Sequence, residues 1–385
     1  MRYKSWFQTL LTLIILLGIT TAIFLYTSGY RLQKDAETEI IDFTKTGMIG
    51  AKSLPEGAAV YLDDELITAT NDTIPGIEPG THKLRITKKG FEEWTKDIEI
   101  FAELVTDITA VLVSQSPRLE PLTNTGASNP SVSPSLSNLA YFSKDETSPG
   151  VWVIPVNQGG INIFRSTPSV VLEDTQFNKY SDGKSITWSS DETQLIVETG
   201  TGVFYLVDLQ TNSAQSLLNP NNVKERWAEI LVNKRADFVD KLEITEEIKN
   251  LALSENVKWS PDEKKFLYTV EEGNNLVYKV YNMEKPLPIG ENVETIVFTK
   301  SANEQQPTIS WYSDSFHLLL TENYNETEHS GVISMIRIDG TNKTEIYSNP
   351  LYSPNIYSVP SGDKVIILTS VKSNGQTDLY TVGIR

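Results

Sequence analysis

The chain has 385 residues, of which 39% are hydrophobic and 22% charged, so it is long enough for two or three folded domains. Its formal net charge of −17 excludes a nucleic-acid groove, which needs clustered Lys and Arg. The absence of cysteine excludes disulfides, thiolate metal sites and cysteine nucleophiles.

Residues 1–34 predict a short cytoplasmic stub and a transmembrane signal anchor. Residues 10–26 are uncharged and mostly apolar, and a helix that starts at Trp6 reaches roughly 30 Å by Tyr26, about one hydrocarbon core. Arg2 and Lys4 precede this run, so the N-terminus is expected in the cytoplasm and the rest of the chain outside the membrane. The alternative is a cleaved signal peptide, although a good small-residue cleavage site is lacking. Residues 35–44 are expected to be a linker.

Residues 45–113 have the pattern of a small β-sandwich. Turn residues recur at Pro55-Glu56-Gly57, Asp63-Asp64, Glu78-Pro79-Gly80 and Lys88-Lys89-Gly90. Between the turns, apolar and polar residues alternate with period two, which predicts half-buried antiparallel strands.

This segment resembles the PEGA domain, which is named for the tetrapeptide found here at residues 55–58. The resemblance extends to the turns at Pro79-Gly80-Thr81-His82 and Gly90-Phe91-Glu92-Glu93-Trp94, but Asp63-Asp64 replaces the usual Asp-Gly turn. It implies an extracytoplasmic accessory module and no activity. We interpret His82 as a turn-flanking residue rather than a metal ligand, and Trp94 as a core residue rather than a sugar-stacking platform.

A short phrase recurs through residues 114–385. It reads Trp188-Ser189-Ser190-Asp191, Trp259-Ser260-Pro261-Asp262 and Trp311-Tyr312-Ser313-Asp314, with fainter copies at Val132-Ser133-Pro134-Ser135 and Val359-Pro360-Ser361-Gly362. An apolar run and then a second strand pattern follow each copy. Repetition at about 50 to 70 residues is typical of blade arrays, which predicts a β-propeller with five or six blades.

The repeat resembles that of TolB-like and other WD-repeat-like bacterial β-propellers, whose usual form is W-S-P-D-G. Glu192, Glu263 and Ser315 stand where the terminal Gly is usual. The resemblance implies that each Asp caps a turn and that each Trp packs between blades. We therefore interpret the repeat residues as structural rather than as calcium ligands or ligand contacts. They are Trp188, Asp191, Trp259, Asp262, Trp311 and Asp314.

Residues 220–255 interrupt the repeats with a helical pattern. Asn222 is a candidate N-cap with Glu225 as its capping-box partner, and apolar residues from Trp227 to Leu242 fall near one helical face. The segment is either a helix on the rim of the propeller or an arm that binds a partner.

The sequence has no recognisable catalytic, cofactor or metal motif. It predicts an all-β protein with an N-terminal transmembrane helix, a PEGA-like sandwich and a propeller with one helical insertion. The expected function is non-catalytic binding or scaffolding of a protein or cell-wall component in the bacterial envelope, through the top face or channel of the propeller. The alternatives are a glycan or peptide hydrolase with Asp and Glu at the channel, and a passive spacer or oligomerisation unit.

Overall fold

The computed structural model describes residues 2–27, 30–34, 41–156, 167–348, 350–373 and 375–385. The chain divides into two compact units. The first comprises Met1–Leu112 with Lys285–Glu291, and the second comprises Val113–Glu284 with Asn292–Arg385. The domain boundary therefore falls between Leu112 and Val113.

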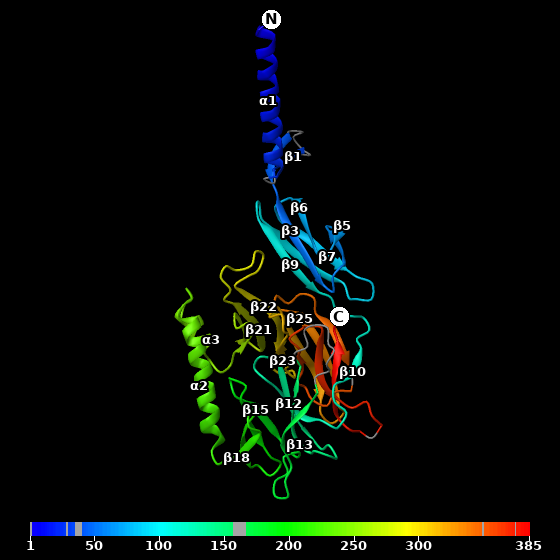
Figure 1. Cartoon of the computed structure of the whole chain (residues 1–385), viewed down its shortest axis with the longest axis vertical. Coiled ribbons are helices and arrows are strands. Elements are labelled where there is room, and N and C mark those ends of the chain that lie inside the picture. The colour runs from blue at the N-terminus through cyan, green and yellow to red at the C-terminus, as the bar shows by residue number, and fades with distance from the viewer. Residues whose placement is uncertain (1, 28–29, 35–40, 157–166, 349, 374) are drawn as a thin grey trace. The chain divides into compact units, whose positions relative to one another are not determined.

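The chain begins with helix α1, Arg2–Thr27 (Figure 1). Within it, Trp6–Leu25 is an apolar stretch of 20 residues, long enough to cross a membrane. Strands β1, Tyr30–Lys34, and β2, Ile41–Lys45, then pair as an antiparallel hairpin. The predicted linker 35–44 is thus partly a strand, because the alternation at residues 41–44 is too short to stand out in the sequence. Its residues 35–40 lie outside the described residues.

The first unit contains a sandwich of a three-stranded sheet in the order β6-β3-β9 and a four-stranded sheet in the order β5-β4-β7-β8. The strands are β3 (Gly47–Leu54), β4 (Ala59–Leu62), β5 (Glu65–Ala69), β6 (Asp72–Ile77), β7 (Gly80–Thr87), β8 (Trp94–Ile100) and β9 (Val105–Val111). The prediction of antiparallel strands is wrong for one pair, because β3 and β9 are parallel. Period two reports burial of one face and carries no information on strand direction.

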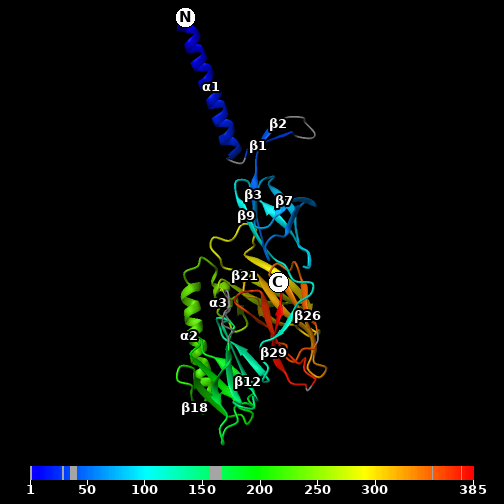
Figure 2. The ribbon, with the colours of Figure 1, turned by 45° about the vertical axis from the view of Figure 1, so that its right-hand side comes forward.

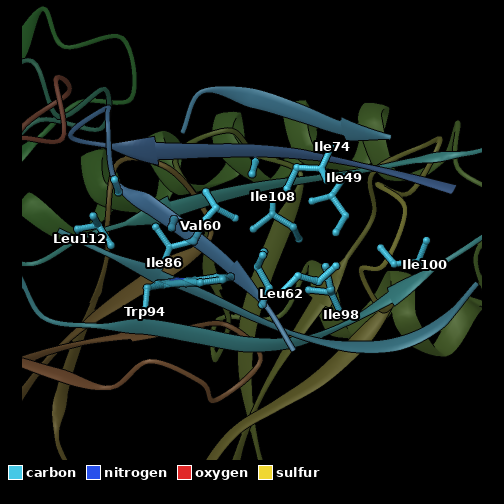
Figure 3. Packing of buried hydrophobic residues seen from close by; sticks show 14 residues of the cluster. Ile49, Val60, Leu62, Ile74, Ile86, Trp94, Ile98, Ile100, Ile108 and Leu112 are labelled. Atoms are coloured by element: carbon cyan, nitrogen blue, oxygen red, sulfur yellow. The ribbon is translucent and has the colours of Figure 1, made fainter. Parts of the chain in front are cut away.

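The inward side chains of both sheets form one apolar core (Figure 3). Ile49 and Ile108 come from the three-stranded sheet, and Val60 and Ile86 from the four-stranded sheet. Trp94 lies in this core with 2% of its surface exposed, so it is not a sugar-stacking platform.

The Asp63-Asp64 turn between β4 and β5 forms although it lacks glycine. Both residues have left-handed φ angles, 50° and 67°, which Asp tolerates better than most residues. The turn is held from β7, where His82 Nδ1 lies 2.7 Å from the Asp63 carboxylate and His82 Nε2 lies 2.8 Å from the carbonyl oxygen of Glu78. Both partners are acceptors, so only the protonated imidazolium can donate to both at once.

We expect this clamp to make the stability of the first unit pH-dependent. Burial disfavours the imidazolium, but the bonds to Asp63 and Glu78 outweigh it and raise the pKa of His82 above 6.5. The stabilisation is therefore complete below about pH 6.5 and is lost as the pH rises through the raised pKa. Calorimetry at pH 6 and pH 9 should show that His82→Gln lowers the free energy of unfolding by up to about 1 kcal/mol only at the lower pH. Asp64→Asn is the control, and an equal His82→Gln effect at both values would contradict the expectation.

The described residues of the second unit form five four-stranded antiparallel sheets, which are the blades of the propeller. Blade 1 is β11 (Ser128–Val132), β12 (Asn138–Ser143), β13 (Gly150–Pro155) and β14 (Ser169–Glu173). Blade 2 is β15 (Ser185–Trp188), β16 (Gln194–Glu198), β17 (Phe204–Asp208) and β18 (Ser213–Leu217). Blade 3 is β19 (Lys258–Trp259), β20 (Lys265–Glu272), β21 (Asn275–Asn282) and β22 (Glu294–Ser301). Blade 4 is β23 (Thr308–Trp311), β24 (His317–Asn325), β25 (Ser330–Arg337) and β26 (Thr344–Ser348).

Blade 5 joins the two ends of the propeller. Its strands are β27 (Tyr357–Ser358), β28 (Lys364–Thr369), β29 (Asp378–Gly383) and β10 (Leu119–Pro121), which precedes blade 1 in the chain. Strand β10 pairs antiparallel with β29, with Leu119 opposite Val382. This pairing closes the ring. The prediction of five or six blades is confirmed, and the number is five.

The turn after each innermost strand has the same hydrogen bonds in every blade, and these fix the alignment of the repeats. The amide of Ser189 donates to the carbonyl of Gln194, and the amide of Val359 likewise donates to that of Lys364. Val359 therefore corresponds to Ser189, and Ser358 takes the Trp position of blade 5. The fifth copy of the phrase therefore begins at Ser358, one residue before the predicted start at Val359. The prediction was wrong here because this copy lacks the Trp and Asp that mark the start and end of the phrase in blades 2 to 4.

In all five blades, the residue at the position where the repeat usually has glycine adopts a left-handed backbone conformation, with φ between 54° and 61°. Only blade 5 has a glycine there; the residues are Leu136, Glu192, Glu263, Ser315 and Gly362. Two of the larger side chains bond to the turn of the preceding blade. Glu192 accepts from the hydroxyl of Ser135 at 2.9 Å, and Ser315 accepts from the amide of Asp262 at 3.1 Å. Such bonds between blades offset the cost of a left-handed non-glycine residue.

The insertion folds as two helices, α2 (Pro220–Val239) and α3 (Glu246–Ala252), which lie beside the blades (Figures 1 and 2). The N-cap of α2 is Asn219, whose side chain accepts from the amide of Asn222, so the prediction of Asn222 as the cap is wrong. Pro220 lacks an amide proton and occupies the first turn, so the cap must precede it. The C-terminal end of α2 and helix α3 pack on blade 3, where Val239 and Ala252 are fully buried.

Candidate functional site

The repeat tryptophans occupy two different environments. Trp188 of blade 2 is buried against blade 1 and donates its indole N–H to the carbonyl of Ser131 at 2.9 Å. Trp311 of blade 4 donates in the same way to the carbonyl of Lys258 in blade 3, at 2.8 Å. Both side chains therefore join a blade to the one before it.

Trp259 differs because the insertion takes the place of the preceding blade. Its indole N–H donates to the carbonyl of Ala252 in α3 at 2.9 Å, and its ring packs among residues of α2 and α3. The guanidinium of Arg235, from α2, lies 4.9 Å from the centre of the ring. Trp259 thus attaches the insertion to the propeller.

The repeat aspartates bond within their own turns. Asp191 accepts from the Ser189 hydroxyl at 2.6 Å, and this bond is the main reason that its pKa is lowered. Burial opposes ionisation of Asp262 and Asp314, but hydrogen bonds and a neighbouring basic side chain outweigh it and lower both pKa values. That side chain is Lys265 for Asp262, at 2.9 Å, and the ring of His317 for Asp314, at 2.6 Å. All three carboxylates are therefore held ionised.

The turns of Asp191 and Asp262 line a cavity of about 850 Å³, which we call the channel-mouth cavity. Its wall combines the turns of blades 1 to 3, the innermost strands of blades 3 to 5, and one face of α2. The α2 residues in the wall are Ile230, Leu231, Lys234 and Arg235. A second cavity, of about 670 Å³, is lined by the opposite ends of the innermost strands, including Asn129 and Lys184.

The channel-mouth cavity carries positive groups although the chain is strongly acidic. Lys234 pairs with Glu263 at 2.7 Å. The side chain of Lys258 is open to the cavity and donates to the carbonyl of Ile309 at 2.8 Å, and enclosure by the walls lowers its pKa. Burial likewise lowers the pKa of Arg235, whose Nε is buried without a hydrogen-bond partner among the described residues.

The acidic groups of the cavity are all engaged. Asp191 and Asp262 bond within their turns, Glu192 bonds to Ser135, and Glu263 pairs with Lys234. Among the described residues, no group of three or more His, Asp or Glu is arranged to hold a metal ion. The cavity therefore presents apolar, hydroxyl and charged groups of both signs, with its carboxylates already hydrogen-bonded or paired.

The sequence predicted a binding surface at the channel but not the residues that distinguish it. Lys258 takes a position where blades 2 and 4 have Thr187 and Ser310, so its departure from the repeat was the available signal. The helical pattern included Ile230 and Leu231 but not Lys234 and Arg235, because a hydrophobic periodicity does not single out polar residues on the same face.

Residues 46–116 match the PEGA domain family. A comparison with curated proteins gave no match. Three similar solved structures cover most of the chain at low identity. TolB from Acinetobacter baumannii is 13% identical over 85% of this chain and 64% of its own, with a TM-score of 0.25. Oligogalacturonate lyase from Vibrio parahaemolyticus is 9% identical over 92% and 96%, with a TM-score of 0.31. A chain of a mitotic checkpoint complex is 12% identical over 70% and 92%, with a TM-score of 0.35.

At such identities these structures carry no argument about activity. The sandwich of the first unit agrees with the family match, and the propeller stands on its own five sheets and their closure. The chain therefore consists of an apolar helix, a PEGA domain and a five-bladed β-propeller.

Proposed function

We propose that this protein is a membrane-anchored binding or scaffold protein of the bacterial cell envelope that holds its partner at the channel-mouth cavity. Helix α1 is the anchor, the PEGA domain is the accessory module, and the propeller outside the membrane is the binding unit. The observation that carries the proposal is the cavity itself, whose size is typical of ligand pockets and whose wall combines apolar surface with hydroxyl and charged groups.

The state of the carboxylates argues against the hydrolase alternative. A glycosidase needs one carboxylic acid with a raised pKa to protonate the leaving group. In the channel-mouth cavity the pKa values of Asp191 and Asp262 are lowered, and both carboxylates already accept hydrogen bonds from their own turns. Groups arranged in this way stabilise a turn and are poor proton donors.

Photo-crosslinking in living cells tests the proposal. We expect p-benzoylphenylalanine at Ile230, which is 53% exposed and lines the channel-mouth cavity, to give a discrete adduct with an envelope component. The control is the same residue at Phe177, which is 92% exposed and lies outside the cavity wall. Adducts that are the same at both positions, or absent at Ile230, would contradict a partner at this cavity.

A further inference from the structure

Two cations in the channel-mouth cavity have no carboxylate within ion-pair distance among the described residues. Lys258 donates only to a backbone carbonyl, and Arg235 contacts the face of Trp259. The nearby Glu263 is already paired with Lys234 at 2.7 Å. Seven charged residues line the cavity, and its four carboxylates are all hydrogen-bonded or paired. Lys258 and Arg235 are therefore the two cations of the wall that no carboxylate of the described residues contacts.

The orientation of Arg235 leaves hydrogen-bonding capacity unused. Its guanidinium lies over the ring of Trp259, 4.9 Å from the ring centre, and its buried Nε has no acceptor among the described residues. A guanidinium that stacks on an aromatic face keeps the N–H groups of its edge available for a carboxylate, which it can bind with two parallel bonds.

The rest of the wall is suited to a peptide. Ile230, Leu231 and Ile356 supply apolar surface, while Ser190 and Thr308 have side chains with no hydrogen bond to the described residues. Free hydroxyls can bond to the amide groups of a main chain, and an acyl chain cannot use them. Apolar surface, free hydroxyls and unpaired cations together match a peptide end with apolar side chains and a free carboxylate.

We propose that the channel-mouth cavity binds the C-terminal carboxylate of a partner protein, with Arg235 and Lys258 as the groups that receive the charge. This inference rests on the proposed function and names the chemistry of the partner at that same cavity. Trp259 holds Arg235 in place beneath the carboxylate, and the face of α2 covers the last residues of the partner. Capture of a chain terminus is a recurring mode of peptide recognition, and here two side-chain cations would receive the carboxylate.

Titration calorimetry with the detergent-solubilised full chain tests this proposal. The probes are N-acetylated tetrapeptides with two randomised C-terminal positions, prepared once as free acids and once as C-terminal amides. We expect the acids to bind and the amides to bind at least about tenfold more weakly, the loss that corresponds to one charge-assisted contact of about 1.4 kcal/mol. Equal affinities for acids and amides would overturn the proposal, as would no binding of the acids.

Variants assign the effect to the two cations. Arg235→Gln and Lys258→Gln should each weaken binding of the acids about tenfold and leave the affinity for amides unchanged. Arg235→Lys should restore part of the affinity, because it keeps the charge but not the planar fork. Arg226→Gln is the matched control, since Arg226 is an exposed arginine of the same helix that does not line the cavity. An equal effect of Arg226→Gln and Arg235→Gln would overturn the assignment.

Inorganic phosphate serves as a competing probe. Phosphate that binds with the same dependence on Arg235 while the peptide acids do not bind would show a phosphate site and overturn the peptide proposal. The two proposals fail separately. A crosslink at Ile230 without discrimination between acids and amides overturns only the carboxylate chemistry, whereas the absence of that crosslink overturns the binding function at this cavity.

Discussion

Replacing Asp378 with Ala is expected to lower the free energy of unfolding of the propeller by about 3–5 kcal/mol, the cost of breaking a buried charged network. Asp378 begins strand β29 and is fully buried. Its carboxylate accepts from the Thr123 hydroxyl at 3.0 Å and the Gly126 amide at 2.9 Å, both in the segment that follows β10, and pairs with Lys372 at 2.8 Å. The variant would leave these donors unsatisfied at the closure of the ring.

Urea unfolding monitored by circular dichroism measures this effect, and Glu120→Ala is the matched control. Glu120 also joins β10 to blade 5, through Lys364 at 3.0 Å, but its side chain is 53% exposed. An exposed ion pair of this kind contributes less than about 1 kcal/mol. Equal losses in the two variants would show that the buried network is not what holds the ring closed.

Replacing the repeat tryptophans should give two distinct outcomes. Trp188→Ala and Trp311→Ala each leave a cavity between two blades and an unpaired carbonyl, which should cost roughly 3–5 kcal/mol and lower the melting temperature of the propeller. Trp259→Ala instead removes the ring and hydrogen bond that attach α3, and the surface under Arg235. We expect it to release the insertion before the blades unfold.

Thermal unfolding combined with limited proteolysis distinguishes these outcomes. Cleavage within residues 220–255 should increase strongly in Trp259→Ala and remain at the wild-type level in the other two variants below their melting temperatures. An insertion that stays protected in Trp259→Ala, with three equal losses of stability, would show that all three tryptophans act as equivalent residues between blades.

The recurring phrase predicted the propeller because its pattern is local. Each copy contains the residues of one turn and the strand that follows it, so the copies at Trp188, Trp259 and Trp311 locate three blades from sequence alone. The sequence left the number of blades open between five and six, and the pairing of β10 with β29 fixes it at five. Strand direction in the sandwich was unpredictable because the parallel partners β3 and β9 are far apart in the chain, so no local pattern links them.

The candidate site was only partly predictable. The tryptophans and aspartates of the phrase were assigned to the architecture by resemblance, and their contacts show that one of them, Trp259, serves the insertion. Arg235 lies on α2 and Lys258 on β19, and the two residues line the same cavity. No periodicity within either element indicates that they share a cavity.

The closure of the ring has a consequence for the synthesis of the protein. Thr381 of β29 bonds to Glu120 of β10 across 261 residues of chain. At about 5–20 residues per second, the ribosome needs roughly 10–50 s between these two strands, far longer than a hairpin needs to form. During this interval β10 has no partner, and the growing row of blades has an unpaired edge that is prone to aggregation. A nonsense mutation before Asp378 would make this open state permanent, so the resulting chain should be handled by chaperones and proteases.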